Sequence, residues 1–423
     1  MTAVVDWEPA SLEISRLRDR SEVELVTRVH ARVAAQIGDQ IGDASSGAIR
    51  LLLAEHVPAA LEQERVVLSR ADRIRLQEAV FAETAGYGPI HDLLLDDSVS
   101  EVMVNGDRDV WVERDGRLYL TDVRFADSAH VLRIIQRVVA PLGRRIDESS
   151  PMVDARLPDG SRVNAIIPPL SLIGPVLTIR KFRAVALTPD ALVAAGSITP
   201  EALRFLRTCV LGRLNVVVAG GSGAGKTTLL NALSSFISAG ERIVTIEDAA
   251  ELRLQQRHVI PLESRPANAE GVGRVTIREL LRNALRMRPD RLVIGECRGA
   301  EALDMLQAMN TGHDGSLTTI HSNSAADAVA RIETMALMAE AALPLRALRD
   351  QVASAIDLVV FVERAREGKR RVTEISELGK VSGDEIEMHP LFAMDVDRGG
   401  LRRGDRRPAF ETKLRARGLE LEP

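Results

Sequence analysis

The residues of this 423-residue chain with the clearest chemistry form a glycine-rich segment between an apolar run and a helical pattern. The segment matches GxxxxGK[ST], a motif whose backbone N–H groups cradle phosphate oxygens at a helix N-terminus. We expect Lys226 to bridge the β and γ phosphates of ATP and the Thr227 hydroxyl to bind Mg²⁺. The expected nucleotide-binding residues are Gly220, Gly221, Ser222, Gly223, Ala224, Gly225, Lys226, Thr227 and Thr228.

Acidic residues follow two predicted buried strands. In RIVTIEDAAEL, Glu247 and Asp248 come directly after the strand and Glu251 follows, whereas Glu296 ends the strand in RLVIGE. Carboxylates at strand carboxyl ends would face the glycine-rich segment and could hold Mg²⁺ and orient water. We expect Glu296 to hold magnesium-bound water and to activate the attacking water, with Glu247 as the alternative for these roles. The sequence alone leaves this division open.

Two histidines flank a glycine-containing turn and a threonine-rich strand in MNTGHDGSLTTIHSNS. His321 follows the strand and could hydrogen-bond to the γ-phosphate, whereas His313 could shape the turn. Two histidines with no neighbouring cysteine pair do not supply a zinc ligand set. The alternative, in which the histidines only pack, also stays open.

Arginines could complete the site, because phosphoryl transfer spreads negative charge over the γ-phosphate oxygens. Arg162 and Arg180 lie on predicted strands that precede the glycine-rich segment, and Arg286, Arg288 and Arg298 lie near the second carboxylate strand. Most arginines in a chain are solvated or packed along their stems, so spacing alone does not select among these five.

The motifs together resemble the secretion-type traffic ATPases of type II and type IV secretion, most closely the tight-adherence (Flp, CpaF-like) pilus assembly ATPases. The resemblance runs from about residue 86 to 395. It rests on the segments GGSGAGKTT, TIEDAAEL, LRMRPDRLVIGECRGAEALDMLQAMNTGHDGSLTTIHSNS, DARLPDGSRVNAIIPP and LTIRKF.

This resemblance implies a RecA-like P-loop ATPase domain after a PAS-like domain, assembled into a hexameric ring. Such rings hydrolyse ATP, and their domain motions act on platform proteins of the inner membrane to extrude pilin subunits. The implied roles are Walker A for Lys226 and Thr227, the Asp box for Glu247, Asp248 and Glu251, Walker B for Glu296, the His box for His313 and His321, and phosphate contacts for Arg162 and Arg180.

The elements that would position these residues change in character along the chain. Helical spacing of apolar residues predicts a helical region over residues 1–85, including a long helix from 58 to 84. Short β-branched runs with hairpin turns predict an α+β domain over 86–190. Alternating strands and helices predict an α/β domain with a mostly parallel sheet over 191–395. A polar, arginine-rich tail over 396–423 is expected to be frayed.

The charge, the cysteine count and the apolar runs of the sequence exclude several classes of function. The net charge of −5 gives no general attraction to nucleic acid or to anionic lipid. Two cysteines, Cys209 and Cys297, are too few for a zinc insertion or a disulfide framework. Without a long apolar run or a signal peptide, we expect a cytoplasmic protein that reaches the inner face of the membrane through partners, with no zinc and no nucleic acid bound.

Three functions fit the sequence. The first is a hexameric motor that hydrolyses ATP to assemble, and possibly retract, Flp/Tad-type pili. The second is a DNA-transfer or effector-secretion ATPase of a type IV system. The third is of another class, an ATP-gated scaffold with little turnover.

Overall fold

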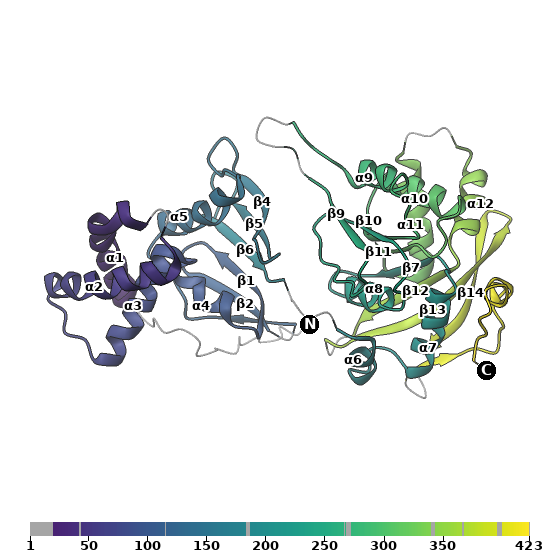
Figure 1. Cartoon of the computed structure of the whole chain (residues 1–423), viewed down its shortest axis with the longest axis horizontal. Helices are drawn as coiled ribbons and strands as arrows, with labels where there is room; N and C mark the ends of the chain where they lie inside the picture. Colours follow the sequence, from purple (N-terminus) through teal and green to yellow (C-terminus); the bar gives the residue numbers. More distant parts are fainter. Residues whose placement is uncertain are drawn as a thin grey trace, which may run out of the picture. The chain divides into compact units, whose positions relative to one another are not determined.

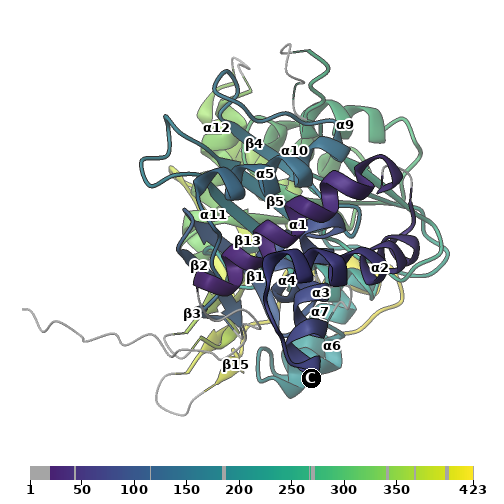
Figure 2. The same ribbon diagram turned by 90° about the vertical axis from the view of Figure 1, so that its left-hand side faces the viewer.

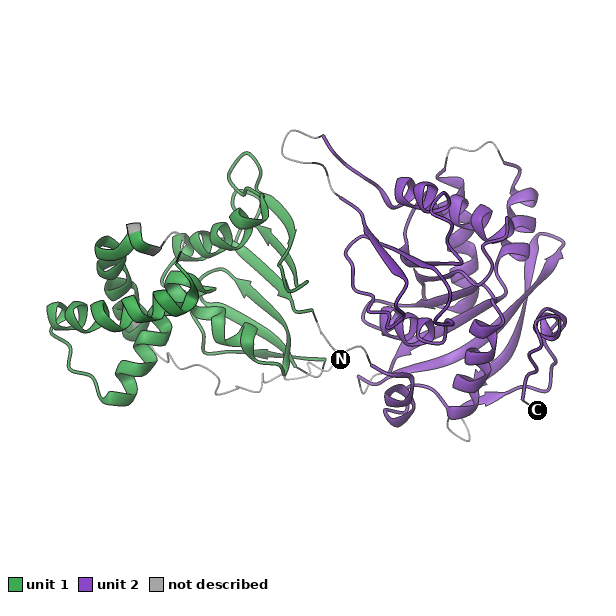
Figure 3. Ribbon diagram, in the orientation of Figure 1, with its two compact units in different colours: residues 1–183 green, residues 184–423 purple. Residues whose placement is uncertain are grey.

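The computed structural model describes residues 20–41, 44–114, 116–182, 187–265, 267, 272–339, 343–365, 368–395 and 400–422. The chain divides into two compact units, residues 1–183 and 184–423 (Figure 3). The boundary between the units falls a few residues before the domain limit that the sequence suggested near residue 190.

Three helices open unit 1, namely α1 (Arg20–Ile41), α2 (Ser46–Glu64) and α3 (Arg70–Ala85) (Figures 1 and 2). Their apolar faces meet in one core that includes Val33 and Val80. The predicted continuous helix from 58 to 84 is wrong, because the chain turns at Arg65, which adopts a left-handed conformation, and a new helix starts after Ser69. The Ser69 hydroxyl accepts a hydrogen bond from the backbone N–H of Asp72, and this capping pattern was the missed sequence signal.

An antiparallel six-stranded sheet makes up the rest of unit 1, in the order β3-β2-β1-β6-β5-β4. Helix α5 packs on it through Val131, Ile134 and Ile135. The elements are a 3₁₀ turn (Gly88–Ile90), α4 (His91–Leu95), β1 (Val99–Asn105), β2 (Asp109–Arg114), β3 (Arg117–Leu120), α5 (Ser128–Val139), a second 3₁₀ turn (Ala140–Leu142), β4 (Met152–Arg156), β5 (Arg162–Ile166) and β6 (Val176–Arg180).

Unit 2 is built on a nine-stranded sheet in the order β15-β14-β13-β12-β7-β11-β10-β8-β9. The six strands from β12 to β9 are parallel, which agrees with the prediction, and β13, β14 and β15 extend the sheet antiparallel at one side. The strands are β7 (Val216–Gly220), β8 (Ile243–Glu247), β9 (Val259–Glu263), β10 (Arg291–Cys297), β11 (Leu317–His321), β12 (Leu358–Arg364), β13 (Arg370–Ser382), β14 (Glu385–Met394) and β15 (Leu401–Arg403).

Helices cover both faces of this sheet (Figure 1). Alternate residues of the buried strands enter different cores, with Val216 and Val218 in one and Val217 and Ala219 in the other, as expected for a strand covered on both faces. One core takes α7 (Pro200–Leu211), α8 (Lys226–Ser234) and α13 (Glu411–Arg415), and the other takes α9 (Ile277–Ala284), α10 (Glu301–Asn310), α11 (Ala325–Leu337) and α12 (Leu345–Ala355); α6 (Pro189–Ala194) precedes α7.

The C-terminal segment corrects one expectation. The sequence predicted a frayed tail over 396–423. Instead, β15 pairs with β14, and the side chains of Phe410 and Leu414 are buried in the unit 2 core. The segment is anchored by three buried apolar residues, Leu401, Phe410 and Leu414. They are too widely spaced to give a periodic pattern in the sequence. Residues 396–399 lie outside the described part of the chain.

Strand β13 also contacts the beginning of unit 2. The backbone N–H of Val372 donates to the carbonyl oxygen of Ser197 at 2.8 Å, and the Val372 side chain is buried. Ser197 stands between α6 and α7, so β13 is tied to the chain segment that enters unit 2.

None of the described helices combines the length and the apolar character that crossing a membrane requires.

Candidate functional site

The glycine-rich segment forms a tight loop, residues 220–227, between β7 and α8. Gly220 has no room for a side chain, because an added Cβ would lie 2.3 Å from the carbonyl oxygen of Val362 on the neighbouring strand β12. Gly223 and Gly225 adopt φ values of +66° and +96°, a region that favours glycine. The loop thus needs these glycines at these places, and it delivers Lys226 and Thr227 to the N-terminus of α8.

Lys226 folds back over its own loop. Its Nζ atom donates to the carbonyl oxygen of Gly221 at 2.9 Å. Burial lowers the pKa of Lys226, the Glu296 carboxylate raises it, and the Arg298 guanidinium lowers it. The ammonium group is therefore partly desolvated, and the negative charge of Glu296, near the carboxyl end of β10, offsets part of that effect.

Glu296 lies at the carboxyl end of β10 and is engaged by a nearby arginine. The Arg298 Nε and Nη2 atoms donate to Glu296 Oε2 at 2.8 and 2.5 Å, and Arg298 also lies 3.7 Å from Asp248. Although burial lowers the pKa of Arg298, these carboxylates raise it above the ordinary value. Arg298 thereby joins the two acidic strand ends that the sequence placed beside the loop.

Glu247, at the end of β8, is buried and its carboxylate binds backbone. Its Oε1 accepts from the N–H groups of Glu251 and Leu252 at 2.9 and 3.1 Å. Gly295 on β10 leaves space for this side chain, because an added Cβ there would lie 2.8 Å from Glu247 Cγ. Glu247 thus shapes the turn after β8, a role that the sequence did not reveal, and Glu251 contributes to that turn through its backbone.

His321 lies beside the loop. It ends β11, which is parallel to β7, and its ladder partner on β7 is Gly220. The next residue, Ser322, donates its N–H to the Gly220 carbonyl at 3.2 Å. The expected placement of His321 beside the glycine-rich loop agrees with this geometry.

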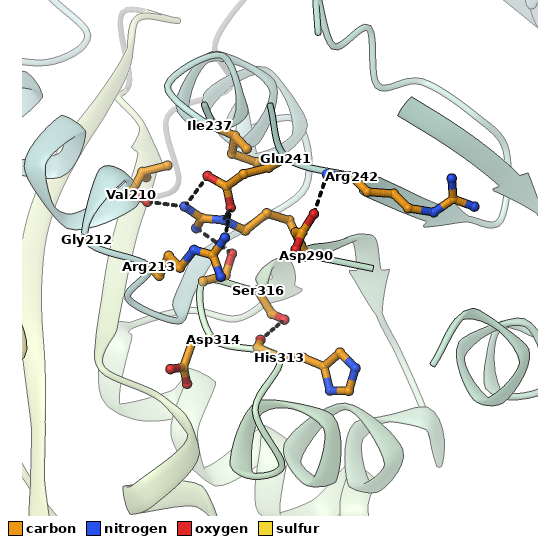
Figure 4. A network of polar contacts seen from close by, with 12 residues as sticks. Val210, Gly212, Arg213, Ile237, Glu241, Arg242, Asp290, His313, Asp314 and Ser316 are labelled. Carbon is orange, nitrogen blue, oxygen red and sulfur yellow. Dashed lines mark hydrogen bonds and ion pairs between the residues drawn. The ribbon is translucent and has the colours of Figure 1, made fainter. Parts of the chain in front are cut away.

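His313, Arg286 and Arg288 lie elsewhere. His313 precedes β11, and the two arginines precede β10, so all three are at the amino edge of the parallel strands, opposite the carboxyl edge that carries Lys226. Figure 4 shows His313 with Asp290 and Arg242 at this edge. Within one chain these three residues therefore lie away from the glycine-rich loop, and their contribution to the ATP site stays a prediction. Nearness in sequence to a strand does not say at which end of the strand a residue lies.

The amino edge contains a buried ion pair. Arg291 is fully buried, and its Nε donates to Glu241 Oε2 at 2.6 Å, while its Nη1 and Nη2 donate to the carbonyls of Gly315 and Val210 at 3.1 and 2.8 Å. Arg213 lies 2.8 Å from the same Glu241 oxygen (Figure 4). These hydrogen bonds and ion pairs connect the amino-terminal ends of β8, β10 and β11 to the end of α7.

Arg162 and Arg180 belong to unit 1. They are direct partners across β5 and β6, and Arg156 of β4 and Glu101 of β1 extend the same row. The row places three arginines next to one acid, a basic strip that could meet an anion. The sequence identified two of its members.

Two further arginines lie at the glycine-rich loop and were missed. Arg370 Nε donates to the Gly223 carbonyl at 3.0 Å, and Arg364 Nη1 lies 3.6 Å from the place of a Cβ on Gly223. Both come from the β12–β13 hairpin. Their position depends on β12 pairing with β7, and no sequence spacing shows that strand order.

Comparison with known proteins identifies a family for this chain. The family described as "Type II/IV secretion system protein" matches residues 83–383. A putative conjugal transfer protein of Mycobacterium tuberculosis is 42% identical over 323 residues, 75% of this chain and 90% of that protein. The type IV secretion system protein PtlH of Bordetella pertussis is 37% identical over 320 residues, 68% of this chain and 92% of that protein.

A solved structure, that of the Yersinia pseudotuberculosis ATPase DotB, is 17% identical with a TM-score of 0.50, covering 71% of this chain and 79% of the other. The fold and the loop define a mixed α/β protein with a phosphate-loop motif at the carboxyl edge of a parallel sheet. The chain belongs to the type II/IV secretion system protein family.

Proposed function

We propose that the chain is an ATPase that hydrolyses ATP to drive a type II/IV secretion machine. The observation that carries the proposal is the placement of Lys226 and Thr227 at the N-terminus of α8, directly after a glycine-rich loop in which Gly223 and Gly225 adopt positive φ values. A helix N-terminus and a lysine together favour a triphosphate over a neutral ligand.

The donor set fits magnesium. Thr227 offers a hydroxyl oxygen and Glu296 a carboxylate oxygen, the hard ligands that Mg²⁺ prefers. When bound, Mg²⁺ neutralises charge on the β and γ phosphates. Glu247 is less suited as a ligand, because its carboxylate already accepts backbone N–H groups.

We assign the steps to residues accordingly. Lys226 leaves the Gly221 carbonyl and binds phosphate oxygens, and His321 contacts the γ-phosphate. Glu296 leaves Arg298 and takes the proton of the attacking water. Asp248, Glu251 and Glu247 support this arrangement, and Arg162 and Arg180 neutralise charge that develops on the γ-phosphate.

Single-turnover hydrolysis tests the enzymatic part. We expect Glu296→Gln to keep ATP binding and to lower the hydrolysis rate roughly 10²- to 10⁴-fold, because it removes a general base. Glu374→Gln, on β13, is a control and should hydrolyse ATP at the wild-type rate. Equal rates for wild type and Glu296→Gln would favour the ATP-gated scaffold instead.

For the assembled state, we propose a ring of six copies at the inner face of the membrane, acting on platform proteins to build Flp/Tad-type pili. The motif resemblance supports this proposal. Light scattering of the full chain with and without a nonhydrolysable ATP analogue tests it. A single copy per particle in both conditions contradicts the ring.

A second candidate function is DNA transfer or effector secretion by a type IV system. The names of the two curated relatives, a putative conjugal transfer protein and a type IV secretion system protein, favour it. Deleting the gene in its host separates the two functions. Loss of surface pili with normal DNA transfer and effector secretion supports the pilus motor, and the reverse supports the transfer ATPase.

A further inference from the structure

The β12–β13 hairpin ends at the glycine-rich loop. Strand β12 runs parallel to β7, and its Val362 is the ladder partner of Gly220. The two strands of the hairpin then meet at the pair Arg364 and Arg370. The strand order therefore places the guanidinium groups of Arg364 and Arg370 beside the glycine-rich loop, although both residues are distant from it in sequence.

Arg370 contacts the loop at two places. Its Nε donates to the carbonyl oxygen of Gly223 at 3.0 Å, and its Cδ lies 3.2 Å from where a Cβ on Gly225 would stand. The stem of Arg370 thus covers one glycine while its head group binds another. Arg364 approaches Gly223 from the same hairpin.

The hydrogen bond to Gly223 fixes the direction of a neighbouring N–H group. The Gly223 carbonyl and the Ala224 N–H belong to one peptide unit, and in a trans unit they point in opposite directions. With the carbonyl held by Arg370, the Ala224 N–H points to the interior of the loop, where it lies 3.4 Å from the Gly221 carbonyl oxygen. Lys226 Nζ donates to that same oxygen at 2.9 Å.

Two donors thus converge on one carbonyl oxygen inside the loop, at the place where phosphate oxygens would bind. We propose that Arg370 is a positioning residue for nucleotide binding, which holds the peptide unit between Gly223 and Ala224 so that its N–H faces the phosphates. Arg364 adds positive charge on the same side. The proposal rests on the proposed function, since it assigns Arg370 to the same nucleotide site.

The hairpin is held together by backbone hydrogen bonds. Its ladder continues from Arg364 and Arg370 through Val362 and Val372, and its turn is closed by the Ala365 N–H donating to the Lys369 carbonyl at 2.8 Å. Substitution of Arg370 should therefore alter the loop and leave the sheet intact. Arg371, next on β13, serves as a matched control, because neighbouring strand residues point to opposite faces.

The test measures nucleotide affinity and loop exchange in the full chain. The variants are Arg370→Gln, Arg370→Lys, Arg371→Gln and Lys226→Ala, and the probe is a fluorescent ADP analogue displaced by unlabelled ADP and ATP. We expect Arg370→Gln to weaken ADP binding about tenfold, because a hydrogen bond from a charged donor is lost. Arg371→Gln should bind as the wild type does.

Amide hydrogen exchange of the nucleotide-free protein gives a second readout. We expect faster exchange over residues 221–228 in both Arg370→Gln and Arg370→Lys, because lysine keeps the charge but lacks the Nε donor. Two results would overturn the proposal. One is wild-type exchange together with wild-type affinity in Arg370→Lys. The other, given a wild type that binds ADP, is an ADP affinity of Arg370→Gln within about twofold of the wild-type affinity. If the wild type itself binds no nucleotide, the proposed function fails instead.

Discussion

The Nζ atom of Lys226 is hydrogen-bonded to the carbonyl oxygen of Gly221, at the other end of the loop that positions the lysine. The lysine therefore has a partner inside its own loop. If the loop binds a triphosphate as proposed, phosphate oxygens would have to replace the Gly221 carbonyl as that partner. Removing the lysine frees a backbone carbonyl without opening a core.

Lys226→Ala should abolish ATP hydrolysis while the chain stays folded. We expect the hydrolysis rate to fall about 10²- to 10³-fold or more, because an oriented donor that stabilises negative charge is lost. The measurement is steady-state phosphate release, with circular dichroism to check folding. Lys380→Ala, an exposed lysine of β13, should leave turnover unchanged. Retained turnover in Lys226→Ala would show that the loop does not bind the triphosphate.

Glu247→Ala should loosen the turn that follows β8. Its carboxylate accepts the N–H groups of Glu251 and Leu252, and losing this acceptor should lower the free energy of unfolding by about 1–3 kcal/mol. Hydrogen exchange of residues 248–254 with and without the substitution checks this. Protection in the variant equal to that of the wild type would contradict the structural role, and Glu251→Ala, which keeps the backbone donor, is the matched control.

The buried pair of Arg291 and Glu241 should be critical for stability. Arg291→Met removes the buried partner of Glu241 and the donor to two buried carbonyls, and leaves only the partly exposed Arg213 beside the carboxylate, so we expect it to lower the free energy of unfolding by about 3–5 kcal/mol. Replacing both residues by apolar ones should recover most of that loss. Denaturant titration followed by hydrogen exchange in β8 and β10 measures the effect. Arg402→Met, which breaks the exposed pair with Asp395, should change little.

Acid should weaken the same pair. Burial alone raises the pKa of Glu241, but the hydrogen bond and charge of Arg291, with Arg213, lower it more, so the folded-state pKa lies below the unfolded one. The stability from this group is then present above the ordinary glutamate pKa of about 4.3 and is lost as the pH falls through the lower folded value. A variant with both Arg291 and Glu241 made apolar should lose less stability than the wild type between about pH 5 and about pH 3, because it lacks the carboxylate that titrates there. Parallel acid curves would refute this linkage.

Phe410→Ala tests the anchoring of the C-terminal segment. The Phe410 ring is buried with its centroid 6.3 Å from that of Phe205, so removing it should lower the free energy of unfolding by about 3–5 kcal/mol. Calorimetry of the full chain measures the shift. Arg407→Ala, at an exposed position of the same segment, should have almost no effect. A similar small shift for Phe410→Ala would mean that the segment contributes little to the core.

The sequence predicted those parts of the fold whose signals are local. The strand before Gly220, the helix after Thr227 and the acids after β8 and β10 depend on short apolar runs and on one motif, and the structure agrees with them. The break at Arg65 was missed because the helical periodicity continues on both sides of it.

Long-range features were not accessible from the sequence. That Arg370 reaches Gly223 depends on the order β13-β12-β7, and that His313 lies away from Lys226 depends on the direction of β11. Neither order nor direction leaves a trace in residue spacing. The engagement of Glu247 by backbone N–H groups likewise depends on how the chain turns after β8.

The hydrogen bond from Val372 to Ser197 gives the hairpin a second attachment. Arg370 and Val372 stand on the same strand, one bound to the nucleotide loop and the other to the stretch of backbone by which the chain arrives from unit 1. A displacement of the glycine-rich loop would therefore be transmitted along β13 to the backbone at Ser197, ahead of α7.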